Sequence, residues 1–364
     1  MKILYVTTIG GTTRFFKDFI KLLLSKGHTV DFAANETTSE VKPYYREWGC
    51  KIHQISCTRS PFNKGSIKAI KEIKKIVEEN NYDIVHCHTP IAAMCTRLAC
   101  IKARKKGTKV FYTAHGFHFY KGAPLKNWIM YYPIEKICSY FTDLLITINK
   151  EDYTLAQKKL KAKKVVYVPG VGIDLETFKP SAISKEEKRK ELGIPQDAKL
   201  LISVGELNSN KNHETVIKAI KDLDVYYVVA GNGGLQSHLQ SIIDETGMTD
   251  RVKLLGFRTD MSELYTASDV FVFPSFREGL SVSLMEAMAS GKPCVVSKIR
   301  GNTDLIDENG GFYFNPYNVN ECSAAIQKVL NSDIDSMSQY NLEKVKKFSL
   351  DKVINQLKGL YFDK

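Results

Sequence analysis

The chain has 364 residues, of which 43% are apolar and 25% are charged, a composition that is ordinary for a globular protein. This length predicts two domains of about 150–200 residues each, and no run reaches the roughly 18 apolar residues that a membrane-spanning helix needs. The formal net charge of +12 is concentrated in the first half of the chain, which indicates an anionic partner for that half.

The first half of the chain alternates between predicted strands and helices. An apolar run at 2–8 predicts a buried strand, because it is too short for a secretory signal and lacks a small-residue cleavage site. A helix is predicted at 15–27, with Gly27 just beyond its end. Further apolar runs predict strands at 28–34, 51–55, 83–89, 109–115 and 144–149. Since helical patterns separate most of these runs, a parallel sheet with right-handed connections is favoured.

The same alternation restarts after the polar stretch at 181–198. Strands are predicted at 200–206, 225–233, 251–256, 269–275 and 292–297. We therefore predict an α/β protein with two doubly wound parallel-sheet domains, residues 1–175 and 176–349, that face each other across a cleft. Ligands of such sheets bind at the carboxyl ends of the strands, so the functional residues are expected there.

The charge differs strongly between the two halves. Residues 1–170 hold 29 lysines and arginines against 13 acidic residues, whereas residues 171–364 hold 23 against 27. Nucleic acid is not favoured as the partner, because the chain has no helix-turn-helix, zinc or RNP-type pattern. An anionic membrane surface suits the amphipathic stretch at 66–81 and the basic cluster at 102–109, and a solvated basic face without a partner is the alternative.

The eight cysteines form no C-x-x-C pair, and several lie in apolar runs. This usage is typical of reduced, buried thiols in the cytoplasm.

Glycines follow two of the predicted strands. Gly10 and Gly11 would let backbone N–H groups approach a phosphate, although the pattern is not G-x-G-x-x-G and a tight turn is the other explanation. Gly231 begins the run GNGG, which has the same two interpretations.

Histidines lie on two neighbouring predicted strands. His86 and His88 share one face of a strand, but no further ligand has a usual metal spacing, so packed neutral histidines are favoured over a metal site. His115 ends the next strand and precedes a glycine. It either contacts a sugar hydroxyl or a developing charge, or is a buried structural histidine.

The stretch PSFREGLSVSLMEAMASG at 274–291 sets Glu278 and Glu286 eight positions apart across the start of a predicted helix. Glu278 is expected in the loop and Glu286 about two turns into the helix. The helical rise separates the two carboxylates by roughly 10–12 Å, too far for a pair that cleaves one glycosidic bond, which needs about 5–9.5 Å. The span matches an extended nucleotide-sugar. A diphosphate would bind the helix N-terminus beside Leu280 and Ser281, with Glu278 on a sugar hydroxyl and Glu286 on the ribose diol. Two solvated helix carboxylates are the alternative.

The segment EGLSVSLMEAMASGKPCVVS at 278–297 resembles the E-x(7)-E block of the retaining family 4 glycosyltransferases. The resemblance extends over nearly the whole chain through further ordered motifs: GG at 10–11, GHTV at 27–30, DIVHCH at 83–88, TAHG at 113–116, VPGVGID at 168–174, SVGELNSNKNHETVIKA at 203–219 and SDVFVFPSFREG at 268–279. The segment at 113–136 is similar to members that build bacterial capsular or exopolysaccharide repeat units. The resemblance implies the GT-B fold, in which two Rossmann-like domains bind the acceptor and the donor respectively. It also implies that a final helix at about 350–364 packs back on the first domain.

The resemblance implies roles for individual residues. Lys211 would neutralise the diphosphate, Glu278 would contact the donor sugar, and His115 would touch the transferred sugar and hold the reacting geometry. These three are the expected catalytic residues. The implied donor site comprises Gly10, Gly11, Glu206, Asn208, Lys211, Gly231, Phe257, Arg258, Glu278, Gly279, Leu280, Ser281 and Glu286.

One position departs from the family pattern. The family usually has arginine where this chain has Glu206, five residues before Lys211. Losing one cation of a pair weakens the stabilisation of the leaving group. Arg277 or Arg300 is expected to substitute for it, because both lie in neighbouring motif loops.

The expected activity is that of a hexosyltransferase that retains the configuration of the sugar. No cofactor and no metal is expected, because no D-x-D motif is evident and protein cations replace the ion. The resemblance implies a UDP-sugar donor, with UDP-GlcNAc or UDP-GalNAc preferred, and a polyprenyl-diphosphate-linked acceptor on an anionic membrane. The protein would then be cytoplasmic and bound to the inner face of the cell membrane. A nonhydrolysing UDP-sugar 2-epimerase of the same architecture and a noncatalytic component of a polysaccharide assembly complex are the alternatives.

Overall fold

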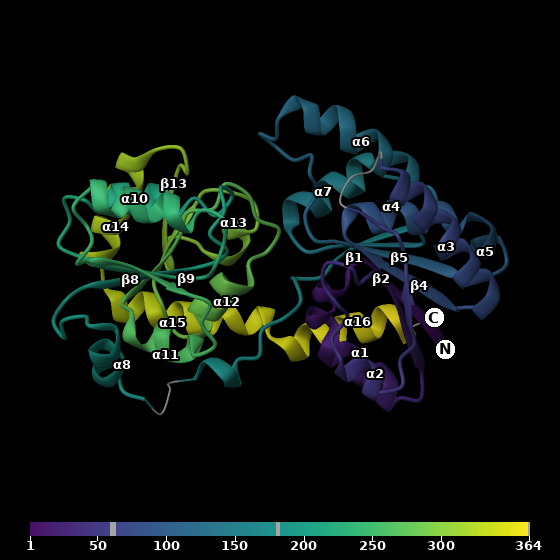
Figure 1. Ribbon diagram of the computed structural model, residues 1–364, viewed down its shortest axis with the longest axis horizontal. Helices are drawn as coiled ribbons and strands as arrows, with labels where there is room; N and C mark the ends of the chain where they lie inside the picture. Colours follow the sequence, from purple (N-terminus) through teal and green to yellow (C-terminus); the bar gives the residue numbers. More distant parts are fainter. Residues whose placement is uncertain (59–62, 180–182, 363–364) are drawn as a thin grey trace. The chain divides into compact units, whose positions relative to one another are not determined.

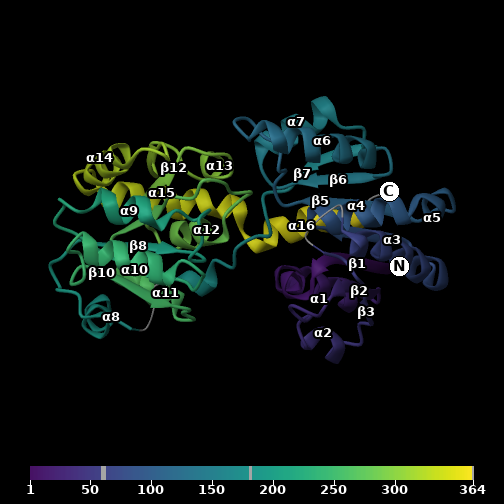
Figure 2. The same ribbon diagram turned by 45° about the horizontal axis from the view of Figure 1, so that its top comes forward.

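The computed structural model describes residues 1–58, 63–179 and 183–362, and the chain divides into two compact units. Unit 1 consists of Met1–Val171 and the end of the chain from Ile354, and unit 2 consists of Gly172–Val353. Each unit is built on one parallel β-sheet with helices on both of its faces (Figures 1 and 2). The predicted α/β class with two doubly wound parallel sheets is therefore confirmed.

The sheet of unit 1 has seven parallel strands in the order β3-β2-β1-β4-β5-β6-β7. These strands are β1 (Lys2–Ile9), β2 (Thr29–Asn35), β3 (Ile52–Gln54), β4 (Ile84–His88), β5 (Lys109–Ala114), β6 (Leu144–Thr147) and β7 (Lys164–Tyr167). The strand order reverses between β1 and β4. These two strands pair directly, although β2 and β3 lie between them in the chain. Sites of doubly wound sheets form at the strand ends on either side of such a reversal. In unit 1 those ends lead into Gly10 and Thr89.

Helices cover both faces of this sheet because its strands carry buried side chains on both sides. Val85 and Cys87 of β4 belong to the apolar core that α3 and α4 cover, whereas His86 and His88 point to the opposite face and contact Tyr5. The helices of unit 1 are η1 (Gly10–Phe16), α1 (Lys17–Ser25), α2 (Tyr44–Glu47), α3 (Lys64–Asn80), α4 (Pro90–Ala99), α5 (Ile101–Lys105), α6 (Leu125–Ser139) and α7 (Lys150–Lys159).

The first helical segment begins earlier than predicted. A 3₁₀-helix starts at Gly10, directly after β1, and continues as α1 to Ser25. Gly27 has a φ of +76°, so it ends this segment in the left-handed conformation that the sequence predicts for the residue beyond a helix.

The sheet of unit 2 has six parallel strands in the order β10-β9-β8-β11-β12-β13. The strands are β8 (Leu200–Val204), β9 (Tyr226–Ala230), β10 (Val252–Gly256), β11 (Val270–Phe273), β12 (Cys294–Ser297) and β13 (Gly311–Phe314). The order repeats the plan of unit 1, and its reversal lies between β8 and β11. The carboxyl ends at this reversal lead into Gly205 and Pro274.

The helices of unit 2 follow its strands and bury one apolar core against them. Leu201, Tyr227, Val229 and Val272 form its centre, and each is 0% exposed. The helices are η2 (Glu176–Phe178), α8 (Lys185–Leu192), α9 (His213–Ala219), α10 (Gln236–Glu245), α11 (Met261–Ala267), α12 (Val282–Ala289), α13 (Asn302–Leu305), α14 (Val319–Leu330), α15 (Ile334–Val345) and η3 (Lys346–Phe348).

The last helix, α16 (Leu350–Phe362), begins in unit 2 and completes the core of unit 1. It is drawn in yellow in Figure 1. The hydroxyl of Tyr361 lies 2.8 Å from that of Tyr5 and also bonds Nδ1 of His86. The Tyr361 ring contacts Phe19 and Phe111 edge-on. The end of the chain is therefore part of the core that surrounds β1, β4 and β5.

All eight cysteines are buried and unpaired, as predicted. Among the described residues, no helix combines the length and the apolar character that crossing a membrane requires.

Candidate active site

The predicted site residues of unit 2 lie in the loops that follow its strands, except Glu286, which lies in α12. In chain order these loops carry Glu206 and Asn208 after β8, Gly231 after β9, Phe257 and Arg258 after β10, Arg277 to Ser281 after β11, and Arg300 after β12. Parallel strands end at the same edge of their sheet, so these loops share one edge of unit 2. Glu278 follows β11, one of the two strands at the reversal.

Lys211 and Glu278 form an ion pair at this edge. The Nζ atom of Lys211 lies 2.8 Å from Oε1 of Glu278, although 67 positions separate them in the chain. Their side chains are only 19% and 15% exposed, and the ammonium group also lies over the ring of Phe273, 4.7 Å from its centre. The ammonium thus neutralises a carboxylate that would otherwise repel an anionic ligand.

Helix α12 begins directly after Glu278. Ser281 is its N-cap, and its hydroxyl accepts a hydrogen bond from the backbone N–H of Leu284, which explains why the helix starts at Val282. Leu280 is 8% exposed and anchors the preceding loop in the core. The N-terminus of a helix carries a partial positive charge and N–H groups without intrahelical partners. An anion-binding element therefore lies beside the Lys211–Glu278 pair.

Tyr265, a residue that no sequence motif indicates, forms a hydrogen bond with Glu286. The hydroxyl of Tyr265 in α11 lies 3.1 Å from Oε2 of Glu286 and 3.1 Å from the carbonyl oxygen of Ser283. Because α12 begins at Val282, Glu286 lies just over one turn into the helix, not about two turns as the spacing had suggested. No motif marks Tyr265, since its contact arises only when α11 and α12 pack together.

Arg300 contacts the same loop. Its Nε atom donates to the carbonyl oxygen of Glu278 over 3.3 Å, and the residue is 7% exposed. Gly301 has a φ of +78° and leaves no room for a side chain, because a Cβ atom there would lie 2.2 Å from the carbonyl oxygen of Gly279. Arg300 is therefore close to the ion pair. The carbonyl group of Arg277 accepts a hydrogen bond from Asn210, and Glu206 is exposed.

Close contacts surround the glycines at strand ends, with backbone atoms at Gly231 and Gly10 and with a side chain at Gly11. A Cβ atom on Gly231 would lie 1.9 Å from the carbonyl oxygen of Gly205. In unit 1, a Cβ atom on Gly10 would lie 2.2 Å from the backbone nitrogen of Val41, and one on Gly11 would meet the side chain of Ser39 at 2.3 Å. Close approach of neighbouring loops is thus sufficient to explain these glycines, whether or not a phosphate also binds there.

Phe257 and Arg258 directly follow β10, and their side chains differ in exposure and in contacts. Phe257 is 71% exposed. The guanidinium of Arg258 pairs with Asp260 and with Glu191, the latter at 2.8 Å. These two cation–carboxylate contacts fix the Arg258 side chain on unit 2 itself.

In unit 1, His115 follows β5 and lies beside His88. Its Nε2 atom is 3.1 Å from Nδ1 of His88. Burial lowers the pKa of His115 to about 4, so its ring is neutral at pH 7. His86 uses both ring nitrogens, one on the Tyr361 hydroxyl and one on Oγ1 of Thr113 at 2.8 Å. These bonds favour a structural role for His86 over metal ligation.

His213 is a second residue that the motifs did not single out. It begins α9 two residues after Lys211 and is 2% exposed. Neither of its ring nitrogens has a hydrogen-bond partner within the described part of the chain. Burial and the charge of Lys211 lower its pKa to about 4. A buried, neutral imidazole thus lies near Lys211 and near the backbone of Gly205 and Glu206.

Two protein families together match most of this chain, one in each half. Residues 184–347 match the family described as glycosyl transferases group 1, and residues 2–149 match the family described as glycosyl transferase 4-like.

Similar proteins of known sequence or structure agree with these matches. The chain is 38% identical over 320 residues to the putative glycosyltransferase EpsD of Bacillus subtilis, covering 85% of this chain and 82% of EpsD. It is 30% identical over 311 residues to the UDP-Gal:alpha-D-GlcNAc-diphosphoundecaprenol alpha-1,3-galactosyltransferase of Escherichia coli, covering 82% and 79%. The crystal structure of Anabaena Alr3699/HepE in complex with UDP superposes with a TM-score of 0.81 at 20% identity, over 99% of both chains.

Proposed function

This chain belongs to the group 1 and family 4-like glycosyltransferases, and we propose that it moves an N-acetylhexosamine from UDP to a polyprenyl-diphosphate-linked glycan with retention of configuration. The fold is GT-B, like that of Alr3699/HepE, and the activity is that of a hexosyltransferase. The Escherichia coli relative supports the acceptor class, because its name specifies a sugar on diphosphoundecaprenol. The UDP complex of Alr3699/HepE supports the nucleotide. We also propose a place in exopolysaccharide biosynthesis, because residues 113–136 resemble members of the family that build such repeat units.

The observation that carries this proposal is the Lys211–Glu278 ion pair beside the N-terminus of α12. We assign the donor to unit 2, with its diphosphate at this helix end and Lys211 as the neutralising cation. Glu278 takes a hydroxyl of the transferred sugar. Glu286, held by Tyr265, takes the ribose diol. In this assignment the Lys211 ammonium binds the diphosphate, either in place of the Glu278 carboxylate or together with it.

The catalytic contribution is electrostatic. The UDP leaving group gains negative charge as the sugar bond breaks, and Lys211 together with the helix N-terminus stabilises that charge without a metal ion. Arg300 is the better placed of the two candidate cations to assist, because it already contacts the Glu278 backbone. His115 is neutral at pH 7, so it acts on the sugar as a hydrogen-bonding group and not as a cation.

We assign the acceptor to unit 1, and this unit to the inner face of the cell membrane. The first half of the chain is basic, with 29 lysines and arginines against 13 acidic residues in residues 1–170. Such a charge favours anionic lipid headgroups, among which a polyprenyl-diphosphate acceptor resides.

Calorimetric titration with a panel of nucleotide-sugars tests the donor, and mass analysis of the product on a short polyprenyl-diphosphate sugar tests the reaction. We expect UDP-GlcNAc or UDP-GalNAc to bind and to be consumed in the presence of a chelator. Glu278→Gln should abolish turnover, and the exposed Glu245→Gln is the matched control that should not. Free epimerised nucleotide-sugar without acceptor would instead identify a 2-epimerase. A chain that binds no nucleotide-sugar would be a noncatalytic component.

A further inference from the structure

Helix α6 of unit 1 carries an apolar face that is exposed to solvent. Leu125 is 73% exposed, Ile129 68%, Met130 40%, Ile137 58% and Tyr140, which follows the helix, 56%. They account for five of the ten large apolar side chains that are exposed among the described residues. Spacings of three and four residues bring side chains to the same side of a helix. We call these five residues the α6 face.

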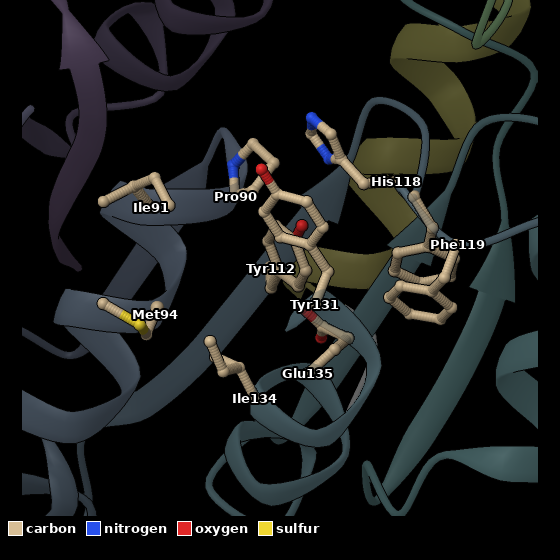
Figure 3. A pocket seen from close by; sticks show the side chains of 10 residues that line it. Pro90, Ile91, Met94, Tyr112, His118, Phe119, Tyr131, Ile134 and Glu135 are labelled. Atoms are coloured by element: carbon tan, nitrogen blue, oxygen red, sulfur yellow. The ribbon is translucent and has the colours of Figure 1, made fainter. Parts of the chain in front are cut away.

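The other side of α6 is already packed, so the α6 face cannot turn inward. The guanidinium of Arg97 in α4 pairs with both carboxylate oxygens of Glu135 at 2.5 and 2.9 Å, and the Arg97 side chain is 0% exposed. The indole N–H of Trp128 donates to the carbonyl oxygen of Tyr120 over 3.2 Å. Figure 3 shows Tyr131 and Ile134 on this inner side, across from the residues of α4 that line the same pocket. A helix that is apolar on both sides normally has both sides covered.

Positively charged side chains lie among the residues of the α6 face. Lys126 and Lys136 are exposed on the helix, whereas its one carboxylate, Glu135, is the buried partner of Arg97. At the end of the helix, Arg104 of the basic helix α5 donates to the carbonyl oxygen of Tyr140 over 3.0 Å. Arg104 therefore lies at the Tyr140 end of the α6 face. A partner that binds this surface must offer apolar groups to the exposed apolar side chains and negative charge to the lysines.

The amphipathic stretch at 66–81 does not meet this description. In α3, Ala69, Ile73 and Val77 are buried in the core. Its lysines form pairs with glutamates one turn later, such as Lys75 with Glu79 at 3.8 Å. Such pairs offset much of the positive charge along this helix.

We propose that the α6 face inserts into the interfacial layer of an anionic membrane, with Lys126 and Lys136 of the same helix on the lipid headgroups. An anionic bilayer matches both the apolar side chains and the lysines among them. The inference rests on the proposed function, since an acceptor with a polyprenyl chain is presented at such a surface. It names the part of unit 1 that makes the contact.

Vesicle co-sedimentation of the full chain tests this surface. We compare phosphatidylcholine vesicles with vesicles that also contain phosphatidylglycerol, for the chain as it is and for Ile129→Ser/Ile137→Ser. Both isoleucines are more than half exposed, so folding is expected to be unaffected. We expect binding to the anionic vesicles to fall at least about tenfold in the double variant. The matched control is Ile67→Ser in α3, which is 62% exposed and should bind as before.

A fluorescent label reports whether the α6 face itself enters the bilayer. All eight cysteines are buried, so Ile129→Cys and Ile67→Cys can each be labelled selectively with an environment-sensitive dye. We expect a blue shift on adding anionic vesicles for the label at position 129 and none for the label at position 67. Raising the salt from about 0.1 to 1 M should weaken binding, because the Debye length falls from about 10 to 3 Å.

The outcomes separate this inference from the proposed function. Loss of vesicle binding with unchanged turnover on a water-soluble acceptor analogue supports the inference. Equal binding by the Ile129→Ser/Ile137→Ser variant overturns it, even where the chain is an active glycosyltransferase. A dimer in sedimentation velocity that this variant dissociates, without any effect on vesicles, would make the α6 face an interface between two copies and also overturn it.

Discussion

Replacing Lys211 by methionine is expected to weaken UDP binding by about 10- to 150-fold. The lysine ammonium is mostly buried and lies 2.8 Å from Glu278, at the edge of the sheet where we place the diphosphate. A hydrogen bond to a charged group contributes about 1.5–3 kcal/mol, which corresponds to that range of affinity. In this variant Glu278 also loses its cation and faces the diphosphate directly, so repulsion adds to the loss. Glu278→Gln should act in the opposite direction on UDP alone, because it removes a negative charge while Lys211 remains.

A double-mutant cycle measured by calorimetry with UDP checks this reasoning. Glu278→Gln should raise the affinity for UDP more in the Lys211→Met background than in the unmodified chain, because only there is the carboxylate without its cation. The two changes should therefore be non-additive. The sugar contact is read separately, since Glu278→Gln should weaken UDP-sugar binding relative to UDP. If Lys211→Met binds UDP within about twofold of the unmodified chain, or if the two changes are additive, then the ion pair is not the diphosphate site.

Three further outcomes follow from the geometry. Tyr265→Phe removes a hydroxyl from Glu286 and should weaken UDP binding about two- to tenfold in the same titration, as a net hydrogen bond of about 0.5–1.5 kcal/mol implies; unchanged affinity would place the ribose elsewhere. Gly231→Ala would bring a Cβ atom to 1.9 Å from a backbone oxygen and should lower the melting temperature of unit 2, whereas Gly234→Ala, with no atom within 4 Å, should not. Burial lowers the pKa of His86 to about 3, below its unfolded value of about 6.5, so the unfolded chain binds protons first on acidification. The free energy of unfolding of unit 1 should therefore fall from about pH 6.5 downward, and urea titrations that show no change between about pH 6.5 and 5 would contradict this.

The strand pattern was predictable because both faces of each sheet are buried, which makes most strands short apolar runs. Two strands were not predicted, β7 and β13, and each has only four residues at one edge of its sheet. Their apolar runs, VVYV at 165–168 and FYF at 312–314, are shorter than a typical strand of about 5–6 residues. The predicted strand at 225–233 overran its true end at Ala230, because it included Gly231, Asn232 and Gly233 of the loop that follows.

The residue types of the site could be predicted from motifs, but their contacts could not. Lys211 and Glu278 lie on loops after different strands, and their pairing depends on how β8 and β11 sit side by side. The contact between Tyr265 and Glu286 likewise depends on the packing of two helices. Spacing along the chain placed Glu286 too far into its helix, since it gave no sign that Ser281 caps the helix.

The docking of Tyr361 against Tyr5 and His86 has a consequence for how the protein is made. Unit 1 contains the two ends of the chain, and unit 2 is inserted between them. During translation, unit 1 therefore cannot complete its core until residues 172–353 have been translated. Until then, the face of unit 1 that α16 later covers is exposed to water. At about 5–20 residues per second this interval is on the order of ten to forty seconds. A nascent chain stalled or cleaved before its final turn would leave that aromatic surface available to chaperones and to aggregation, although every strand of its sheet had already emerged.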